Sequence, residues 1–357
     1  MRATRVELRL SALRHNLEVV RCTAPQSRVM AAVKADGYGH GLVRVARALA
    51  GADALAVSSA SEALQLREAG IRTPICLLEG FFHSDELAPL QDHGLTTVVH
   101  QFHQVELLER AALRAPVRVW IKVDSGMHRL GFPPEQVRMA WERLGRLAQV
   151  ERLGFLTHLA CADDLDSPAT PRQLDTFASA TRELPGARSI GNSAGLLAWP
   201  EARSDWVRPG IMLYGVSPFF QRVGTEEGLE PVMTVRSELM AVNHLKRGDA
   251  VGYGGTWICP EAMPVGVIAI GYGDGYPRHA RTGTPVLLNG RRVPLIGRVS
   301  MDMITVDLRS QPEARIGDPA VLWGEGLPVE EIADHAGTIG YELLCGITGR
   351  VPRIEIP

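Results

Sequence analysis

Short apolar runs alternate with amphipathic segments over roughly the first 220 residues of the chain. The runs are rich in β-branched and aliphatic side chains, which is typical of buried strands. The segments between them, such as LVRVARALA and HQVELLERAALR, repeat apolar residues at helical spacing. We expect strands at 29–34, 54–59, 74–80, 96–100, 117–124, 152–160, 187–192 and 206–215.

Eight strands that alternate with helices over about 200 residues are typical of a (β/α)8 barrel, in which catalytic groups stand at the carboxyl ends of the strands. An open, doubly wound sheet is the alternative architecture. The glycine fingerprint GxGxxG, which dinucleotide enzymes of that class carry after the first strand, is absent here. The pattern therefore favours the barrel.

From about residue 230 onwards the chain consists of β-rich runs separated by glycine and proline turns. Helical spacing returns clearly only in PVEEIADHAG, near the end. We predict an α/β protein with an N-terminal TIM-like barrel over residues 1–233 and a mainly β domain over residues 234–357. We also expect residues 1–10 to be able to pair with the second domain.

Composition narrows the classes of ligand and compartment. The 357 residues carry a formal net charge of −2, so no basic excess points to nucleic acid or to an anionic membrane. The first 17 residues contain charges throughout and no apolar segment of signal-peptide or membrane-span length. We expect a soluble, cytoplasmic protein that acts on a small molecule. Free thiols without a zinc site are expected because no CxxC pair occurs among the cysteines at 22, 76, 161, 259 and 345.

The stretch VKADGYGHG, residues 33–41, is the strongest candidate for chemistry. Lys34 ends an apolar run and a glycine-rich turn follows at once. A lysine that loses solvent at the end of a buried strand has a lowered pKa, which frees its amine to attack a carbonyl carbon. Lys34 is therefore a candidate Schiff-base lysine. The structural alternative is a lysine that reaches water beside an ordinary turn.

Other chemically able residues also stand at or just past predicted strand ends. Each has a structural explanation when taken singly, such as a core histidine, a loop-capping arginine or a surface ion pair. Together they favour a site, because strand ends of a barrel meet at one mouth. The loop GYGDGYP, residues 271–277, resembles a phosphate loop only weakly, and two adjacent turns explain it as well. The strand-end residues are Tyr38, Lys122, Arg129, His158, Asn192, Ser193 and Arg208.

An ordered set of motifs along the whole chain resembles the bacterial alanine racemases, which are fold-type III pyridoxal-phosphate enzymes. Single motifs of this kind are weak, but the ordered set is specific. The matching motifs are VKADGYGHG, IKVDSGMHRLGF, THLA followed by Asp163, GNSAG, VRPGIMLYG, VGYGGTW, GYGDGYPR, GRVSMDM and RVPR.

The resemblance implies a racemase that interconverts L-alanine and D-alanine, supplying D-alanine for peptidoglycan or serving alanine catabolism. Pyridoxal 5′-phosphate would be bound covalently by Lys34, and Tyr253 of a second copy would act on the opposite face of the substrate. The active unit would be a head-to-tail homodimer with shared sites. Further cofactor contacts implied by the resemblance are Tyr38, His158, Asn192, Ser193, Arg208, Gly210 and Ile211.

The same resemblance assigns supporting roles. Exchange of the hand of an α-carbon needs an acid–base group on each face, and a free tyrosine, with a pKa of about 10, is a poor base near neutrality. His158 and Arg208 would favour its phenolate. Arg129 would clamp the substrate carboxylate with the backbone N–H of Met301 from the second copy, and Lys122 matches a position that is carbamylated in many members. Candidate residues of an entryway are Asp163, Arg278 and Arg298.

One position departs from part of the family. Gly349 stands where some members have a tyrosine just before RVPR, so we expect a pocket that lacks one phenol and accepts serine or other small amino acids. A fold-type III decarboxylase is a rival interpretation, against which VGYGGTW and IKVDSGMHRLGF both argue. A non-catalytic pyridoxal-phosphate carrier is another, although a carrier has no need of a second domain with a second base.

Overall fold

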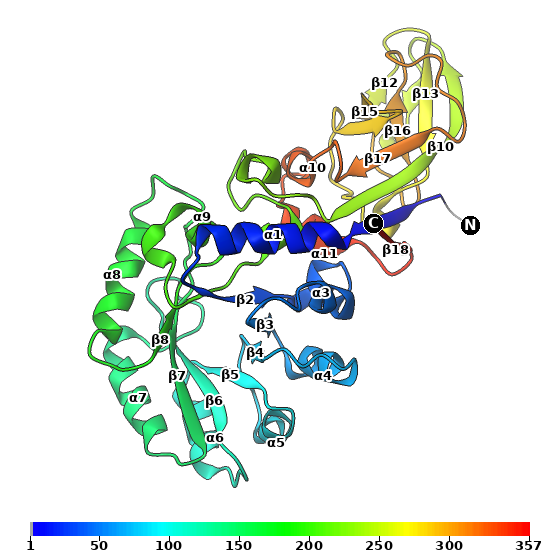
Figure 1. The fold of residues 1–357 in the computed structure, drawn as a ribbon. Helices are drawn as coiled ribbons and strands as arrows, with labels where there is room; N and C mark the ends of the chain where they lie inside the picture. Colours follow the sequence, from blue (N-terminus) through cyan, green and yellow to red (C-terminus); the bar gives the residue numbers. More distant parts are fainter. Residues whose placement is uncertain (1–2) are drawn as a thin grey trace.

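Eight parallel strands close into a barrel in the N-terminal part of the computed structural model, which describes residues 3–357 (Figure 1). Consecutive strands are neighbours, and β9 closes the barrel by pairing with β2 at Trp206 and Arg28. The predicted fold class is confirmed. The strands are β2 (Arg28–Ala32), β3 (Ala54–Val57), β4 (Ile75–Leu77), β5 (Thr96–Val99), β6 (Val117–Lys122), β7 (Val150–Leu156), β8 (Ala187–Ser189) and β9 (Trp206–Val207).

The strands are shorter than the apolar runs that predicted them. The run at 206–215, for example, forms only a two-residue strand, and its second half turns into a 3-10 helix, η4 (Ile211–Tyr214). Apolar side chains remain buried in such turns, so hydrophobicity alone did not mark where each strand ends. The interior of the barrel is filled by a layer of side chains from several strands, as in other barrels of this class. These are Met30, Ala54, Ala56, Cys76, Val98, Trp120 and Leu156.

Helices surround the barrel and bury one apolar face each. In α7 the buried residues Val137, Ala140, Trp141 and Leu144 follow the spacing of one helix face. None of the helices within residues 3–357 is both long and apolar enough for a membrane span. The N-terminal helices are α1 (Leu10–Thr23), α2 (Lys34–Tyr38), α3 (Leu42–Ala48), α4 (Ala60–Glu68), α5 (Leu87–Asp92), α6 (Phe102–Arg110), α7 (Val137–Gly145), α8 (Ala169–Thr181) and α9 (Ser193–Ala198).

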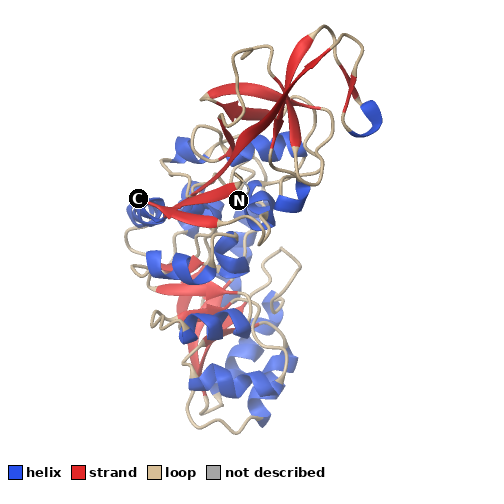
Figure 2. Cartoon of the chain, turned by 90° about the vertical axis from the view of Figure 1, so that its right-hand side faces the viewer, coloured by secondary structure: helices blue, strands red, loops and turns tan. Residues whose placement is uncertain are grey.

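The C-terminal part is mainly β, as predicted, and leans away from the barrel (Figures 1 and 2). Its eight-stranded sheet has the order β13-β16-β15-β14-β17-β10-β1-β18, and β13 also pairs with β10. The N-terminal strand β1 (Arg5–Arg9) lies between β10 and β18. The other strands are β10 (Met233–Leu245), β13 (Met263–Ile268), β14 (Pro285–Leu288), β15 (Arg291–Ile296), β16 (Ile304–Asp307), β17 (Pro319–Trp323) and β18 (Arg353–Ile356).

Two smaller features of the C-terminal part bear on function. A hairpin of β11 (Ala250–Val251) and β12 (Trp257–Ile258) carries the 3-10 turn η6 (Tyr253–Gly255) at its tip and projects from the sheet (Figure 2). Helices α10 (Val329–Ala336) and α11 (Gly340–Gly346) follow the last long strands. The helical spacing of the sequence predicted α10 but not α11. The remaining 3-10 turns are η1 (Ser84–Glu86), η2 (Pro134–Gln136), η3 (Pro200–Ala202), η5 (Gly224–Glu227) and η7 (Tyr272–Asp274).

Helix α11 packs directly on the glycine-rich turn that follows β2. Gly39 has a φ of +80°, and a Cβ atom at this position would lie 2.2 Å from the carbonyl oxygen of Leu344. The Nε of Arg353 donates a hydrogen bond of 2.9 Å to the carbonyl oxygen of Gly39. The C-terminal residues therefore hold the turn that carries Lys34, and Gly39 leaves no room for a side chain.

We expect Gly39→Ala to lower the free energy of unfolding by several kcal/mol. The left-handed conformation costs a side chain about 1–2 kcal/mol, and the clash with Leu344 adds to it. Gly70→Ala is the matched control, because Gly70 has a φ of +81° with no heavy atom within 4 Å of the added Cβ. Urea unfolding followed by circular dichroism measures both. Equal decreases in the free energy of unfolding for the two variants would show that the contact of Gly39 with α11 does not contribute to stability.

Candidate active site

The turn after β2 is left-handed over several consecutive residues. Ala35, Asp36 and Tyr38 have φ values of 54°, 53° and 51°, and Gly37 between them has a φ of 61°. For residues other than glycine this conformation costs about 1–2 kcal/mol each, and it persists only where surrounding contacts enforce it. Runs of this kind mark sites where a chain must present particular side chains.

Two carboxylates enforce the turn. Glu62 on α4 accepts hydrogen bonds from the backbone N–H of Ala35 at 2.7 Å and from the N–H and hydroxyl of Ser58 at 2.8 Å each. Asp36 accepts a bond of 2.8 Å from the N–H of Leu42 at the start of α3. The effect is that Lys34 and Tyr38, four residues apart, both line the cavity at the barrel mouth.

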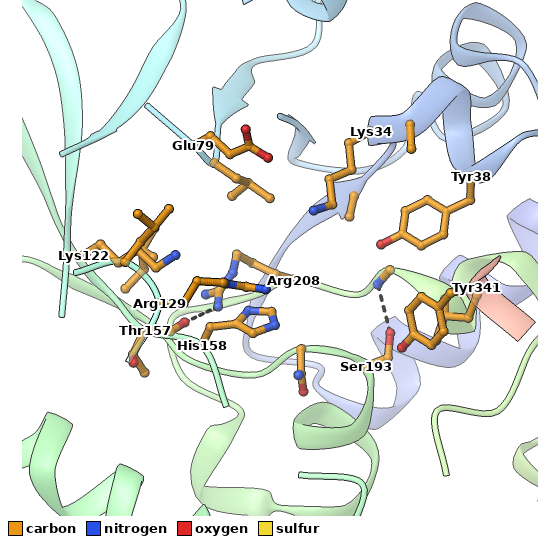
Figure 3. A pocket seen from close by; sticks show the side chains of 18 of the residues that line it. Lys34, Tyr38, Glu79, Lys122, Arg129, Thr157, His158, Ser193, Arg208 and Tyr341 are labelled. Carbon is orange, nitrogen blue, oxygen red and sulfur yellow. Dashed lines mark hydrogen bonds between the residues drawn. The ribbon is translucent and has the colours of Figure 1, made fainter. Parts of the chain in front are cut away.

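This cavity has a volume of about 520 Å³ and lies at the carboxyl ends of the barrel strands (Figure 3). It brings together most of the residues singled out in the sequence, from six different segments of the chain. Those that line it are Lys34, Tyr38, Lys122, Arg129, His158, Asn192, Ser193, Arg208, Gly210 and Ile211.

Arg208 forms part of the floor and is held in one orientation. Its guanidinium donates hydrogen bonds to the hydroxyl of Ser189 at 2.6 Å, to the carbonyl oxygen of Ile190 at 3.2 Å and to the carbonyl oxygen of Thr157. Burial lowers the pKa of Arg208 to about 10, so it remains a cation near neutrality. Because these partners are neutral, its charge stays available to a ligand.

Two neighbouring basic residues, His158 and Lys122, have lowered pKa values. Burial, followed by the charge of Arg208, lowers the pKa of His158 to about 3, so its ring is neutral at ordinary pH. Burial, Arg208, Arg129 and Lys34 lower the pKa of Lys122 to about 8. The floor is thus crowded with basic groups, which favours an anionic ligand.

Ser193 and Tyr38 form a cradle at the other end of the cavity. The Ser193 hydroxyl oxygen accepts hydrogen bonds from the N–H of Gly210 at 2.9 Å and of Met212 at 3.4 Å, which leaves its own proton to be donated elsewhere. A Cβ atom on Gly210 would lie 2.6 Å from the Tyr38 hydroxyl, so only glycine fits there. Hydroxyl donors around a glycine-lined space suit a phosphate group.

Tyr341 also lines the cavity, and sequence reasoning missed it. It stands on α11, and its ring lies 6.1 Å from that of Tyr38, on the side of the cavity where Ser193 projects (Figure 3). Burial, and then Tyr38 and Asp163, raise the pKa of its phenol. The only signal in the sequence was a tyrosine in YELLC near the end, with nothing to connect it to residue 38.

Gly349, where part of the family has a tyrosine, stands apart from this phenol. Gly349 does not line the cavity, and no heavy atom lies within 4 Å of a Cβ built on it. The phenol of Tyr341, eight positions earlier in the sequence, lines the cavity. The acceptance of serine by this pocket stays a prediction, which kinetics on L-serine beside L-alanine would test.

Five predicted residues lie outside the cavity of their own chain. Tyr253, at the tip of the β11–β12 hairpin, is 65% exposed, and Met301 is 52% exposed. Arg278 and Arg298 are exposed on the C-terminal part, and Asp163 is exposed in the segment between β7 and α8. A single copy of the chain therefore does not bring Tyr253 to Lys34.

Family models match nearly the whole chain. The description "Alanine racemase, N-terminal domain" matches residues 8–218, and "Alanine racemase, C-terminal domain" matches residues 232–355. Alanine racemase from Nitrosococcus oceani is 57% identical over 345 residues, 96% of each chain. Alanine racemase from Halorhodospira halophila is 57% identical over 354 residues, 99% of this chain and 97% of the relative.

Solved structures agree with this result. The crystal structure of biosynthetic alanine racemase from Pseudomonas aeruginosa superposes with a TM-score of 0.98 at 45% identity, with all of both chains covered. The structure of alanine racemase from Acinetobacter baumannii gives a TM-score of 0.94 at 37% identity, again over all of both chains. The resemblance seen in the motifs is confirmed: the chain belongs to the alanine racemase family of enzymes.

Proposed function

We propose that the chain interconverts L-alanine and D-alanine with pyridoxal 5′-phosphate, using Lys34 of one copy and Tyr253 of another. The observation that carries this proposal is the pairing of a lysine and a phosphate cradle in one cavity with an exposed tyrosine on a projecting hairpin. The names of the relatives support the substrate. Such an enzyme would supply D-alanine for peptidoglycan or serve alanine catabolism.

The residues present fit the cofactor. Lys34 would hold its aldehyde carbon, Tyr38 and Ser193 would donate to its phosphate together with the backbone of Gly210 and Ile211, and Arg208 would face its ring nitrogen. His158 and Asn192 complete the wall. When bound, pyridoxal phosphate supplies an electron sink for the negative charge left when the α-carbon loses a proton.

The choice of arginine at position 208 would bear on the type of reaction. A guanidinium donates hydrogen bonds but does not give up its proton near neutrality, so Arg208 would bind a ring nitrogen without protonating it. A bound pyridoxal phosphate would then supply a weaker electron sink, which would favour racemisation over transamination.

Inversion requires one base on each face of the α-carbon. Lys34 would serve one face, and Tyr253 of the second copy the other. A tyrosine has a pKa of about 10, so it needs a neighbour that favours its phenolate. Since His158 is neutral, the positive charge that favours the phenolate would come from Arg208 behind it.

Arg129 would bind the substrate carboxylate, because its guanidinium fork matches two carboxylate oxygens. The N–H of Met301 from the second copy would be a further contact. Asp163 of one copy and Arg278 and Arg298 of the other would line the approach to the site. The lowered pKa of Lys122 supports its carbamylation, since only the neutral amine reacts with carbon dioxide, and the product is an anion that could orient Arg129.

We expect Lys34→Ala and Tyr253→Phe each to reduce kcat for L-alanine by at least about 100-fold, because each removes one of the two proton-transfer groups. Co-expression of the two variants should restore about a quarter of wild-type activity. Half of randomly formed dimers are mixed, and one of the two sites in each mixed dimer keeps both groups. D-alanine formation measured by chiral chromatography checks both statements.

Complementation is the sharper part of this experiment. The control for subunit exchange is co-expression of Tyr253→Phe with the wild type, which takes the place of Lys34→Ala. If the co-expressed variants remain as inactive as either alone while mixed dimers are isolated by two affinity tags, Tyr253 does not act in the site of the other copy. If wild type releases carbon dioxide from basic amino acids and racemises nothing, the decarboxylase alternative holds.

The buried amine of Lys122 predicts that the free energy of unfolding decreases as the pH falls from 10.5 to 8. Its folded pKa of about 8 lies below the ordinary 10.5, so the unfolded chain binds this proton more tightly. Below pH 8 the full penalty of about 3 kcal/mol applies, and it fades as the pH rises to 10.5. Lys122→Met should therefore stabilise the cofactor-free protein at pH 7 and lose that advantage by pH 10.

Urea unfolding at intervals between pH 7 and pH 10, in buffer free of carbon dioxide so that the amine stays unmodified, measures this effect. Lys246→Met is the control, since Lys246 is exposed and its loss should leave the stability difference independent of pH. A constant difference between wild type and Lys122→Met over the whole range would contradict the prediction.

A further inference from the structure

The loop that follows β4 is rigidly attached to the next strand and helix. A ring nitrogen of His100, Nε2, lies 3.0 Å from the carbonyl oxygen of Glu79. The Nε2 of Gln104 donates a 3.0 Å hydrogen bond to the carbonyl oxygen of Phe81, and its Oε1 accepts one of 2.8 Å from the N–H of His100. Contacts with the carbonyl groups of Glu79 and Phe81 therefore fix the backbone of residues 79–81.

Glycine is required at the centre of this loop. Gly80 has a φ of +81°, and a Cβ atom there would lie 2.4 Å from both Nε2 of Gln104 and the carbonyl oxygen of Val98. This close packing sets the direction in which the preceding side chain leaves the backbone. That side chain is Glu79, and its carboxylate is turned into the cavity (Figure 3).

Glu79 is the single acidic residue among those of 3–357 that line the cavity. Four basic side chains, Lys34, Lys122, Arg129 and Arg208, line the same space. The Glu79 side chain is exposed, and its carboxylate forms neither a hydrogen bond nor an ion pair with the described part of the chain. A carboxylate on a braced loop, without a protein partner and facing a cavity, is available to a ligand cation.

We propose that Glu79 is a specificity-determining residue that binds the ammonium group of the incoming amino acid. This inference rests on the proposed function, in which the substrate is a zwitterion. Arg129 can receive the substrate carboxylate, and Glu79 provides the opposite charge for the other end. Without Glu79, the basic floor would favour simple carboxylic acids, which the reaction cannot use.

Charge complementarity predicts effects of opposite sign on two ligands. Propionate is alanine without its amine, so it is repelled by Glu79 where alanine is attracted. Glu79→Gln should raise KM for L-alanine up to about tenfold, because the amide keeps a hydrogen-bond acceptor but loses the negative charge that strengthens the bond to an ammonium group. The same change should strengthen propionate binding severalfold, because a like charge has been removed. Damage to the loop would weaken both.

The experiment compares wild type, Glu79→Gln and Glu79→Asp as holoenzymes. Racemisation of L-alanine gives KM and kcat, and isothermal titration calorimetry gives the dissociation constant of propionate. Asp85→Asn is the control, since Asp85 is exposed on the same segment and removes an equal charge outside the cavity. Asp85→Asn should change neither KM for L-alanine nor the dissociation constant of propionate by more than about twofold. Glu79→Asp keeps the charge, so propionate should bind it as weakly as it binds wild type.

Opposite shifts in KM for alanine and in propionate affinity for Glu79→Gln would support the proposal. Parallel weakening of both ligands, or no change in either, would overturn it. The proposed function can fail separately: if wild type does not racemise alanine, the enzymatic assignment is wrong, whereas normal racemisation with parallel shifts disproves only the role of Glu79.

Discussion

The site depends on a short stretch of left-handed backbone. Ala35, Asp36 and Tyr38 adopt a conformation that side chains disfavour, and this geometry brings Lys34 and Tyr38 to one cavity. Glu62 and Asp36 compensate by satisfying backbone N–H groups within and just after the turn. The barrel strands position the remaining groups, but none of them could cooperate with Lys34 if this turn relaxed.

Positive charge is the second constraint on the site. Arg208 is buried with only neutral hydrogen-bond partners, and burial, followed by the charge of Arg208, lowers the pKa values of Lys122 and His158. The cavity thus stores an electrostatic penalty that an anionic ligand would relieve. Apolar residues at these positions would avoid this penalty, so packing alone does not explain the basic floor.

Much of the barrel could be predicted, because its strands are apolar runs with turn residues between them and its functional groups follow strand ends. Tyr341 could not, since it reaches Tyr38 through the packing of α11, and contact between residues 38 and 341 leaves no trace in local spacing. Glu79 was not predicted, because an acidic residue after an apolar run is common. Only the packing of Gly80 and the hydrogen bond of Gln104 show that the loop bearing Glu79 is held in place.

Leu344 and Arg353 contact Gly39, so segments that lie far apart in the sequence pack together at this turn. During synthesis on the ribosome, the barrel strands emerge long before residues 340–353 do. A nascent chain can thus complete its eight-stranded wall while the segment bearing Lys34 still lacks its clamp. The contacts that fix the turn bearing Lys34 can therefore form only after residues 340–353 have been synthesised.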